Sequence, residues 1–231
     1  MSGAKKELWA YKEFEHAQLW DKRCTYSLAA MSERLEQNAG SSFSAACGES
    51  LRQSAGNIFG HESTTIEGLQ QGHYEESAAR CSACDSVIVA QDTSFANYTT
   101  HVATQGLGHI DSAGKSRGLV IHTALALSPK GLPLGVVGQQ IWQRDVKKRG
   151  KRHNRKQTPI EEKESHKWLD GLEWVNERVA PVAQRVCVVA DRESDVFEYM
   201  RQPRAENVAI LLRATHPRRV RVGSATESIS L

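Results

Sequence analysis

The sequence predicts an α/β fold in which a mixed sheet with flanking helices follows a small helical domain. Residues 1–80 are polar and carry apolar residues at helical spacing. From about residue 84, short apolar runs alternate with helical segments, in the order three strands, a helix, a strand, a helix and a strand. This order is typical of a sheet that starts antiparallel and continues parallel. We therefore expect domains over 1–80 and 81–231.

Composition and charge indicate a globular protein without a membrane-spanning segment. The chain has 231 residues, 39% of them hydrophobic and 25% charged, which is typical of a soluble globular protein. No apolar run approaches the roughly 18 residues of a membrane span, and the first residues lack an apolar signal-peptide core. The net charge is only +3, but the charges are unevenly placed, so an acidic partner is expected for one face of the molecule. No membrane partner is expected.

The five cysteines are Cys24, Cys47, Cys81, Cys84 and Cys187. An odd, scattered set argues against a disulfide framework and favours a reducing cytoplasm. The Cys81–Cys84 pair has the spacing of half a zinc site, but no second pair completes it, so two ordinary thiols are expected.

In the first domain, the stretches 7–23 and 26–37 are predicted to be helices. Their buried faces are expected to hold Trp9, Phe14 and Ala17 in the first and Leu28, Met31 and Leu35 in the second. Thr64 and Glu67 have the spacing of a capping box that opens a further helix. The alternative is that this region is an extension packed on the rest of the chain.

The second domain begins with three predicted strands at 86–92, 117–128 and 131–144, the last two joined as an antiparallel hairpin. A helix follows, with Thr158 as its N-cap and Glu161 as the capping-box acid. Its predicted buried face comprises Trp168, Leu172, Val175 and Val179. A strand at 185–191, a helix capped by Ser194 and a last strand at 207–219 complete the order.

Two predicted strands each end in an aspartate, Asp92 and Asp191. If these strands are parallel neighbours, both carboxylates emerge at one edge of the sheet. Paired carboxylates suit Mg²⁺ or Mn²⁺, and two such ions can clamp the oxygens of a phosphodiester. The alternatives are that each aspartate only caps the next helix, and that Arg192, Glu193 and Asp195 form a solvated face.

A basic segment lies between the hairpin and the long helix. Seven of the ten residues from Lys147 to Lys156 are Lys or Arg. Such a segment suits a polyanionic substrate, although an ordinary surface loop is an equal alternative. The candidate DNA-contacting residues here are Lys147, Lys148, Arg149, Lys151 and Arg152.

Several stretches together resemble the motifs of a known family, the DDE transposases of bacterial cut-and-paste insertion elements, in the transposon-five (Tn-five) branch. The stretch "EFEHAQLWDKR" is similar to that family's DNA-binding domain. The other matching stretches, in chain order, are "QDTS" at 91–94, "KSRGLVIHTALALS" at 115–128, "EEKESHKWL" at 161–169, "ADRESD" at 190–195 and "LLRATHPRR" at 211–219.

The resemblance implies a ribonuclease-H-like catalytic domain with the first strand central and the fourth beside it. It implies that Asp92 and Asp191 are the first two members of an Asp-Asp-Glu triad that binds Mg²⁺ or Mn²⁺. Metal-activated water would nick the transposon end. The freed 3′-hydroxyl would then form a hairpin and later attack target DNA. The implied partners are transposon-end DNA, target DNA and a second copy of the chain, in the nucleoid of a bacterial cytoplasm.

Further residues gain roles from the resemblance. Arg213, His216 and Arg218 fall where the family contacts transposon-end DNA, while Thr93 and Arg192 flank the metals and would position phosphates.

The sequence departs from the family at the third carboxylate, because neither Glu206 nor Glu227 lies in the expected Tyr-Arg-Glu-Lys signature. The expectation is therefore an incomplete ribonuclease-H-like sheet with an exposed apolar face, in a truncated transposase that does not catalyse transposition. The alternatives are a non-catalytic DNA-binding remnant that inhibits a full-length transposase, and a stand-alone metal nuclease that uses Glu193 or Asp195 as a further acid.

Overall fold

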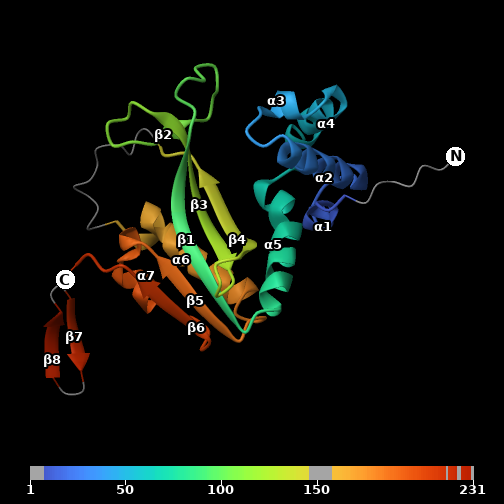
Figure 1. Ribbon diagram of the computed structural model, residues 1–231. Coiled ribbons are helices and arrows are strands. Elements are labelled where there is room, and N and C mark those ends of the chain that lie inside the picture. The colour runs from blue at the N-terminus through green and yellow to red at the C-terminus, as the bar shows by residue number, and fades with distance from the viewer. Residues whose placement is uncertain (1–7, 146–157, 217, 223–224, 230–231) are drawn as a thin grey trace. The chain divides into compact units, whose positions relative to one another are not determined.

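The computed structural model describes residues 8–145, 158–216, 218–222 and 225–229, the last two ranges by their backbone alone. The chain divides into two compact units, residues 1–77 and 78–231, and the division falls within one helix (Figure 1). Among the described residues, no helix is long and apolar enough to cross a bilayer.

The first unit is helical. Its elements are α1 (Tyr11–Phe14), α2 (Lys22–Gln37), α3 (Phe43–Ala46), α4 (Glu49–Phe59) and most of α5 (Ile66–Ser82). Helix α2 is capped by Asp21, whose carboxylate accepts a hydrogen bond from the Arg23 backbone N–H. Apolar side chains from α2, α3 and α4 form a small core, which comprises Leu28, Met31, Ala46, Cys47, Ala55 and Ile58.

Three expectations for this unit are wrong. The stretch 7–23 contains only the short helix α1 before α2 starts, and Trp9 is 58% exposed. Leu35 is also exposed, because the core side of α2 is already filled by Leu28 and Met31. The helix predicted to open at Thr64 is capped instead by Thr65, whose hydroxyl accepts from the Gly68 N–H at 3.0 Å.

The second unit is built on a six-stranded mixed sheet. The strands are β1 (Ser86–Asn97), β2 (Gly108–His109), β3 (Arg117–Leu127), β4 (Pro133–Trp142), β5 (Arg185–Ala190) and β6 (Val208–Leu212). Strand β1 is antiparallel to β3 and parallel to β5, β4 continues the antiparallel side beyond β3, and β6 continues the parallel side beyond β5. Short β2 pairs with the start of β3. The predicted mixed α/β sheet is thus confirmed.

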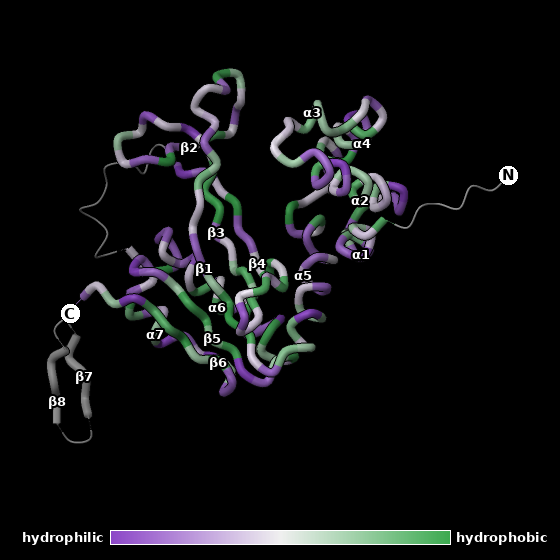
Figure 2. Tube along the Cα trace, viewed as in Figure 1, coloured by the Kyte–Doolittle hydropathy of each residue, from purple (hydrophilic) through white to green (hydrophobic). Residues whose placement is uncertain are grey.

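One face of this sheet carries the main core. Helix α6 (Lys167–Arg178) packs against β1, β3 and β4, and the short α7 (Phe197–Arg201) adds Tyr199 to the same core (Figure 1). The predicted buried face of the long helix is confirmed by Trp168, Leu172, Val175 and Val179, all at most 1% exposed. Apolar residues are concentrated along β5 and β6 in Figure 2, as expected for strands in the parallel part of a sheet.

Several helix starts and strand ends in the second unit differ from the positions predicted from local sequence. The segment expected to start the long helix forms two 3₁₀ turns, η3 (Ile160–Glu162) and η4 (Glu164–His166), and η3 has no side-chain cap. Ser194 does not cap a helix; it lies in the 3₁₀ turn η5 (Arg192–Ser194) and its hydroxyl donates to the Asp191 carbonyl. Strand β1 does not stop at Asp92 but continues to Asn97, because β3 pairs with it along its whole second half.

The last predicted strand is divided. Strand β6 ends at Leu212, and β7 (Arg218–Val222) pairs with β8 (Ala225–Ile229) in a separate two-stranded ribbon. Cys81 and Cys84 are free thiols, as are the other three cysteines. Cys81 is completely buried, and this burial raises its pKa to about 11.

Candidate functional site

The two aspartates lie side by side at the carboxyl end of the parallel strand pair. The last pair of the β1–β5 ladder is Gln91 with Ala190, so Asp92 and Asp191 occupy the next position on each strand. Adjacent strands are about 5 Å apart, which brings the two side chains within reach of one ion. Gln91 and Ala190 are both buried on the face covered by α6, so the aspartates that follow them project from the opposite face.

Both carboxylates are accessible, but their surroundings differ. Asp92 is exposed on a strand that continues past it. Asp191 ends its strand and caps η5, where one carboxylate oxygen accepts from the Glu193 N–H at 2.8 Å. Asp191 therefore does cap the next turn, as the alternative interpretation held, while its second oxygen stays available for a ligand.

A basic residue extends this row of carboxylates. The Arg213 backbone N–H donates to the Ala190 carbonyl at 3.3 Å, which continues the β5–β6 pairing by one residue. Arg213 therefore follows β6 at the position that matches Asp191 after β5. This edge of the sheet thus presents Asp92, Asp191 and Arg213 at the carboxyl side of three adjacent strands.

A buried polar cluster lies behind Asp92, on the face covered by α6. The Thr93 hydroxyl is 3.0 Å from Nδ1 of His122, and Oε1 of Gln91 is 3.3 Å from Nε2 of the same ring. The resemblance implied that Thr93 lies beside the metals. In the structure its side chain lies on the opposite face from the two carboxylates. Strand alternation turns its side chain to the other face.

His122 is neutral at ordinary pH. Its imidazole is completely buried, and this burial, with a smaller contribution from the positive charge of Lys167, lowers its pKa to about 3. The ring stands edge-on to Trp168, with the ring centroids 4.7 Å apart. Neither ring nitrogen is available to a ligand.

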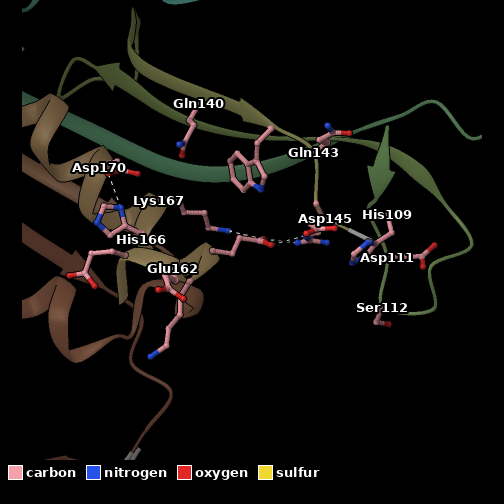
Figure 3. A pocket seen from close by; sticks show the side chains of 15 residues that line it. His109, Asp111, Ser112, Gln140, Gln143, Asp145, Glu162, His166, Lys167 and Asp170 are labelled. Carbon is pink, nitrogen blue, oxygen red and sulfur yellow. Dashed lines mark hydrogen bonds and ion pairs between the residues drawn. The ribbon is translucent and has the colours of Figure 1, made fainter. Parts of the chain in front are cut away.

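A cavity of about 800 Å³, lined by many charged residues, lies between β4 and the start of α6 (Figure 3). Arg144 and Glu164 form a two-pronged ion pair in its wall, with N–O distances of 2.7 and 2.6 Å. Lys167, labelled in Figure 3, also lines the cavity. The Lys167 ammonium is 3.8 Å from Glu164 and 3.6 Å from Glu193, two residues beyond Asp191. The cavity wall is thus linked to the segment that carries Asp191.

Asp195 has a structural role. It is 6% exposed, and one of its oxygens accepts from the backbone N–H groups of Thr215 and His216 at 2.6 and 3.0 Å and from the Thr215 hydroxyl at 3.0 Å. This carboxylate fixes the segment after β6, which contains Arg213 and His216. The nuclease alternative that used Asp195 as a further metal ligand is therefore disfavoured, because the carboxylate is already engaged.

The remaining candidates are only partly placed. Arg192 is exposed within η5, and His216 is exposed beyond β6. Arg218 begins β7, but its side chain is outside the described part of the structure. The candidates that lie wholly outside the described residues are Lys147, Lys148, Arg149, Lys151 and Arg152.

The donor set at the pair suits a hard divalent cation. Two aspartate oxygens on neighbouring strands match the one or two carboxylates that Mg²⁺ usually takes from a protein. Across residues 8–145 and 158–216, however, no group of three or more His, Cys, Asp or Glu side chains forms a metal cluster. The pair would therefore hold an ion with water or phosphate completing its shell.

Sequence patterns did not indicate roles for Gln91 and Lys167, and gave only an indirect signal for His122. A signal for His122 was present, because alternate residues of its strand are apolar and buried. The partners of these residues come from distant parts of the chain and carry no local signal. A scan against models of known protein families finds no match.

Proposed function

We propose that the second unit is a ribonuclease-H-like domain of the DDE-transposase type, which binds Mg²⁺ or Mn²⁺ at Asp92 and Asp191 and engages DNA. The observation that carries this proposal is the parallel pairing that places the two aspartates at matching positions. Asp92 and Asp191, about a hundred residues apart in sequence, lie there on one face of the sheet, and the basic residue Arg213 follows the next strand.

The strand order supports the same proposal. The first strand, β1, is central; β3, β4 and the short β2 form the antiparallel side, and β5 and β6 form the parallel side. A central first strand with the fourth strand of the chain's predicted order beside it is what the resemblance implied. In open sheets of this kind, ligands bind beyond the carboxyl ends of the parallel strands, where the aspartates lie.

The chemistry would be phosphoryl transfer on DNA. A divalent ion would supply Lewis-acid stabilisation of the phosphate oxygens. Asp92 and Asp191 would hold the ion, while Arg213 would orient a phosphate by charge-assisted hydrogen bonds. Transposon-end and target DNA, and a second copy of the chain, are the partners proposed.

A second candidate is DNA binding without cleavage. It is favoured by the donor set, because the described residues bring two carboxylates together where two-metal catalysis usually uses more ligands. On this basis we expect the chain to bind metal and DNA but not to carry out strand transfer.

Mn²⁺ titration calorimetry tests the first proposal. The chain is compared with the double variant Asp92→Ala/Asp191→Ala. The single variant Asp85→Ala is the matched control, because it removes an exposed carboxylate at the other end of β1. We expect binding in the chain and in the control, and no binding in the double variant. Equal binding in all three would overturn the site.

Nicking of supercoiled plasmid DNA in Mn²⁺ separates the two candidates. We expect no nicking, together with salt-sensitive binding of a fluorescein-labelled DNA duplex. Nicking that disappears in the double variant would show that the pair is catalytic without a further acid. Absence of duplex binding at low salt would contradict both candidates.

A further inference from the structure

The backbone at Asp92 is supported from one side only. The β1–β5 ladder ends at Gln91, one residue earlier, while the β1–β3 ladder continues to Asn97. Asp92 therefore lies where β1 and β5 stop pairing. A ligand carboxylate must be held within about 0.5 Å to bind an ion well, so its position has to be fixed from β3 and the covered face.

The residues on either side of Asp92 both contact His122. Gln91 and Thr93 project to the covered face, and their oxygens are 3.3 and 3.0 Å from the two ring nitrogens. His122 is the direct partner of Thr93 in the antiparallel register. One imidazole from β3 thus spans the peptide segment that carries Asp92.

The donor and the acceptor in each contact follow from the tautomer of the His122 ring. The amide oxygen of Gln91 can only accept, so Nε2 of His122 donates to it. In the neutral ring Nδ1 is then an acceptor, and the Thr93 hydroxyl donates to it. Both ring nitrogens have a partner in a fully buried setting, whereas the amide nitrogen of Gln91 has none among the described residues.

Helix α6 closes over this arrangement. A Cβ atom at Gly171 would collide with the Gln91 amide, so the helix backbone rests directly on that side chain. The Trp168 and Trp174 rings lie 4.7 and 6.4 Å from the His122 ring by their centroids. The imidazole and the amide therefore have little room to change conformation.

We propose that His122, together with Gln91 and Thr93, is a positioning device that holds the Asp92 carboxylate in place beside Asp191. The role of this carboxylate as a ligand of a divalent cation rests on the proposed function. None of the three residues would hold the ion itself; they would act through the backbone of β1.

The substitution Thr93→Val tests the device, because it removes the hydroxyl and keeps the β-branched shape. Thr93→Ser restores the hydroxyl and serves as the rescue. Thr99→Val is the matched control, since it makes the same change at a hydroxyl that accepts from the Arg117 N–H, away from His122. All three are compared with the unchanged chain.

Two measurements are made on each protein: amide hydrogen exchange at residues 91–93 and Mn²⁺ affinity. In Thr93→Val we expect faster hydrogen exchange at these amides. We also expect the affinity for Mn²⁺ to fall by about 10-fold, because loss of a residue that supports a metal ligand usually lowers metal affinity by at least that factor. Thr93→Ser should recover both properties, and Thr99→Val should change neither.

The two proposals fail in different ways. If the unchanged chain binds no Mn²⁺, the proposed function fails, and exchange at 91–93 still decides whether the device orders Asp92. If exchange in Thr93→Val equals that in Thr99→Val, the positioning role is overturned even where Mn²⁺ binds.

Discussion

The two faces of the sheet use the same strands in opposite ways. On the face covered by α6, the polar residues Gln91, Thr93 and His122 contact one another beneath the helix. On the other face, Asp92 and Asp191 are exposed. Polar groups on a covered face become structural because their partners are fixed, whereas those on an open face remain available for a ligand.

The apolar residues differ between the faces as well. Val87, Val89 and Val188 are at most 1% exposed under α6, while Leu211 on the other face is 60% exposed. Figure 1 shows α6 on one side of the sheet. The same kind of substitution should therefore have unequal consequences on the two faces.

The strongest contrast is expected at Trp168. We expect Trp168→Ala to lower the free energy of unfolding by about 3–5 kcal/mol, because it empties a fully buried position between α6 and the sheet. Leu211→Ala on the open face should change it by less than about 0.5 kcal/mol. Urea unfolding measures both. Equal losses would show that the open face is covered in solution.

The aspartates give the next contrast. Asp195→Ala should cost about 2–3 kcal/mol, because it leaves the N–H groups of Thr215 and His216 without their acceptor. Asp191→Ala should cost less, since it removes only one cap hydrogen bond at an exposed position. Thermal unfolding compares the two variants. A larger loss for Asp191→Ala would assign it a structural role.

A glycine substitution tests the contact between α6 and Gln91. Gly171→Ala should destabilise the chain by about 1–3 kcal/mol, because the added methyl group meets the Gln91 amide. Gly56→Ala, in α4, should stabilise its helix by about 0.5–1 kcal/mol, because nothing lies within 4 Å of the added atom. Denaturant unfolding followed in each unit is the measurement. A neutral Gly171→Ala would show that α6 can shift.

The pH dependence of stability tests the burial of His122. Its pKa is about 3 in the folded chain and about 6.5 when unfolded, so the unfolded chain binds the extra proton between these values. Stability should therefore fall as pH drops from about 6.5 to 3, by at most about 1.4 kcal/mol per pH unit. NMR titration of the imidazole checks the folded pKa directly. Protonation near pH 6 in the folded chain would contradict the buried setting.

Much of the fold could be predicted from the sequence, because it depends on local periodicity. Short apolar runs identified β1, β3 and β5, and helical spacing identified the face of α6 that carries Trp168 and Val175. Caps were less predictable. Thr65 takes the place of Thr64, and α7, where Ser194 was the expected cap, has no side-chain cap at all, because packing decides where each helix begins.

The local sequence was enough to place Asp92 and Asp191 at or beyond the apolar runs of two strands. The local sequence could not show that the two aspartates occupy neighbouring positions on the same face of the sheet, because the register between distant strands depends on long-range pairing. The contacts of Thr93 with His122 and of Gln91 with Gly171 likewise arise only in the folded chain. Periodicity can assign a side chain to a face, but the partner it meets there is set when the strands and helix pack together.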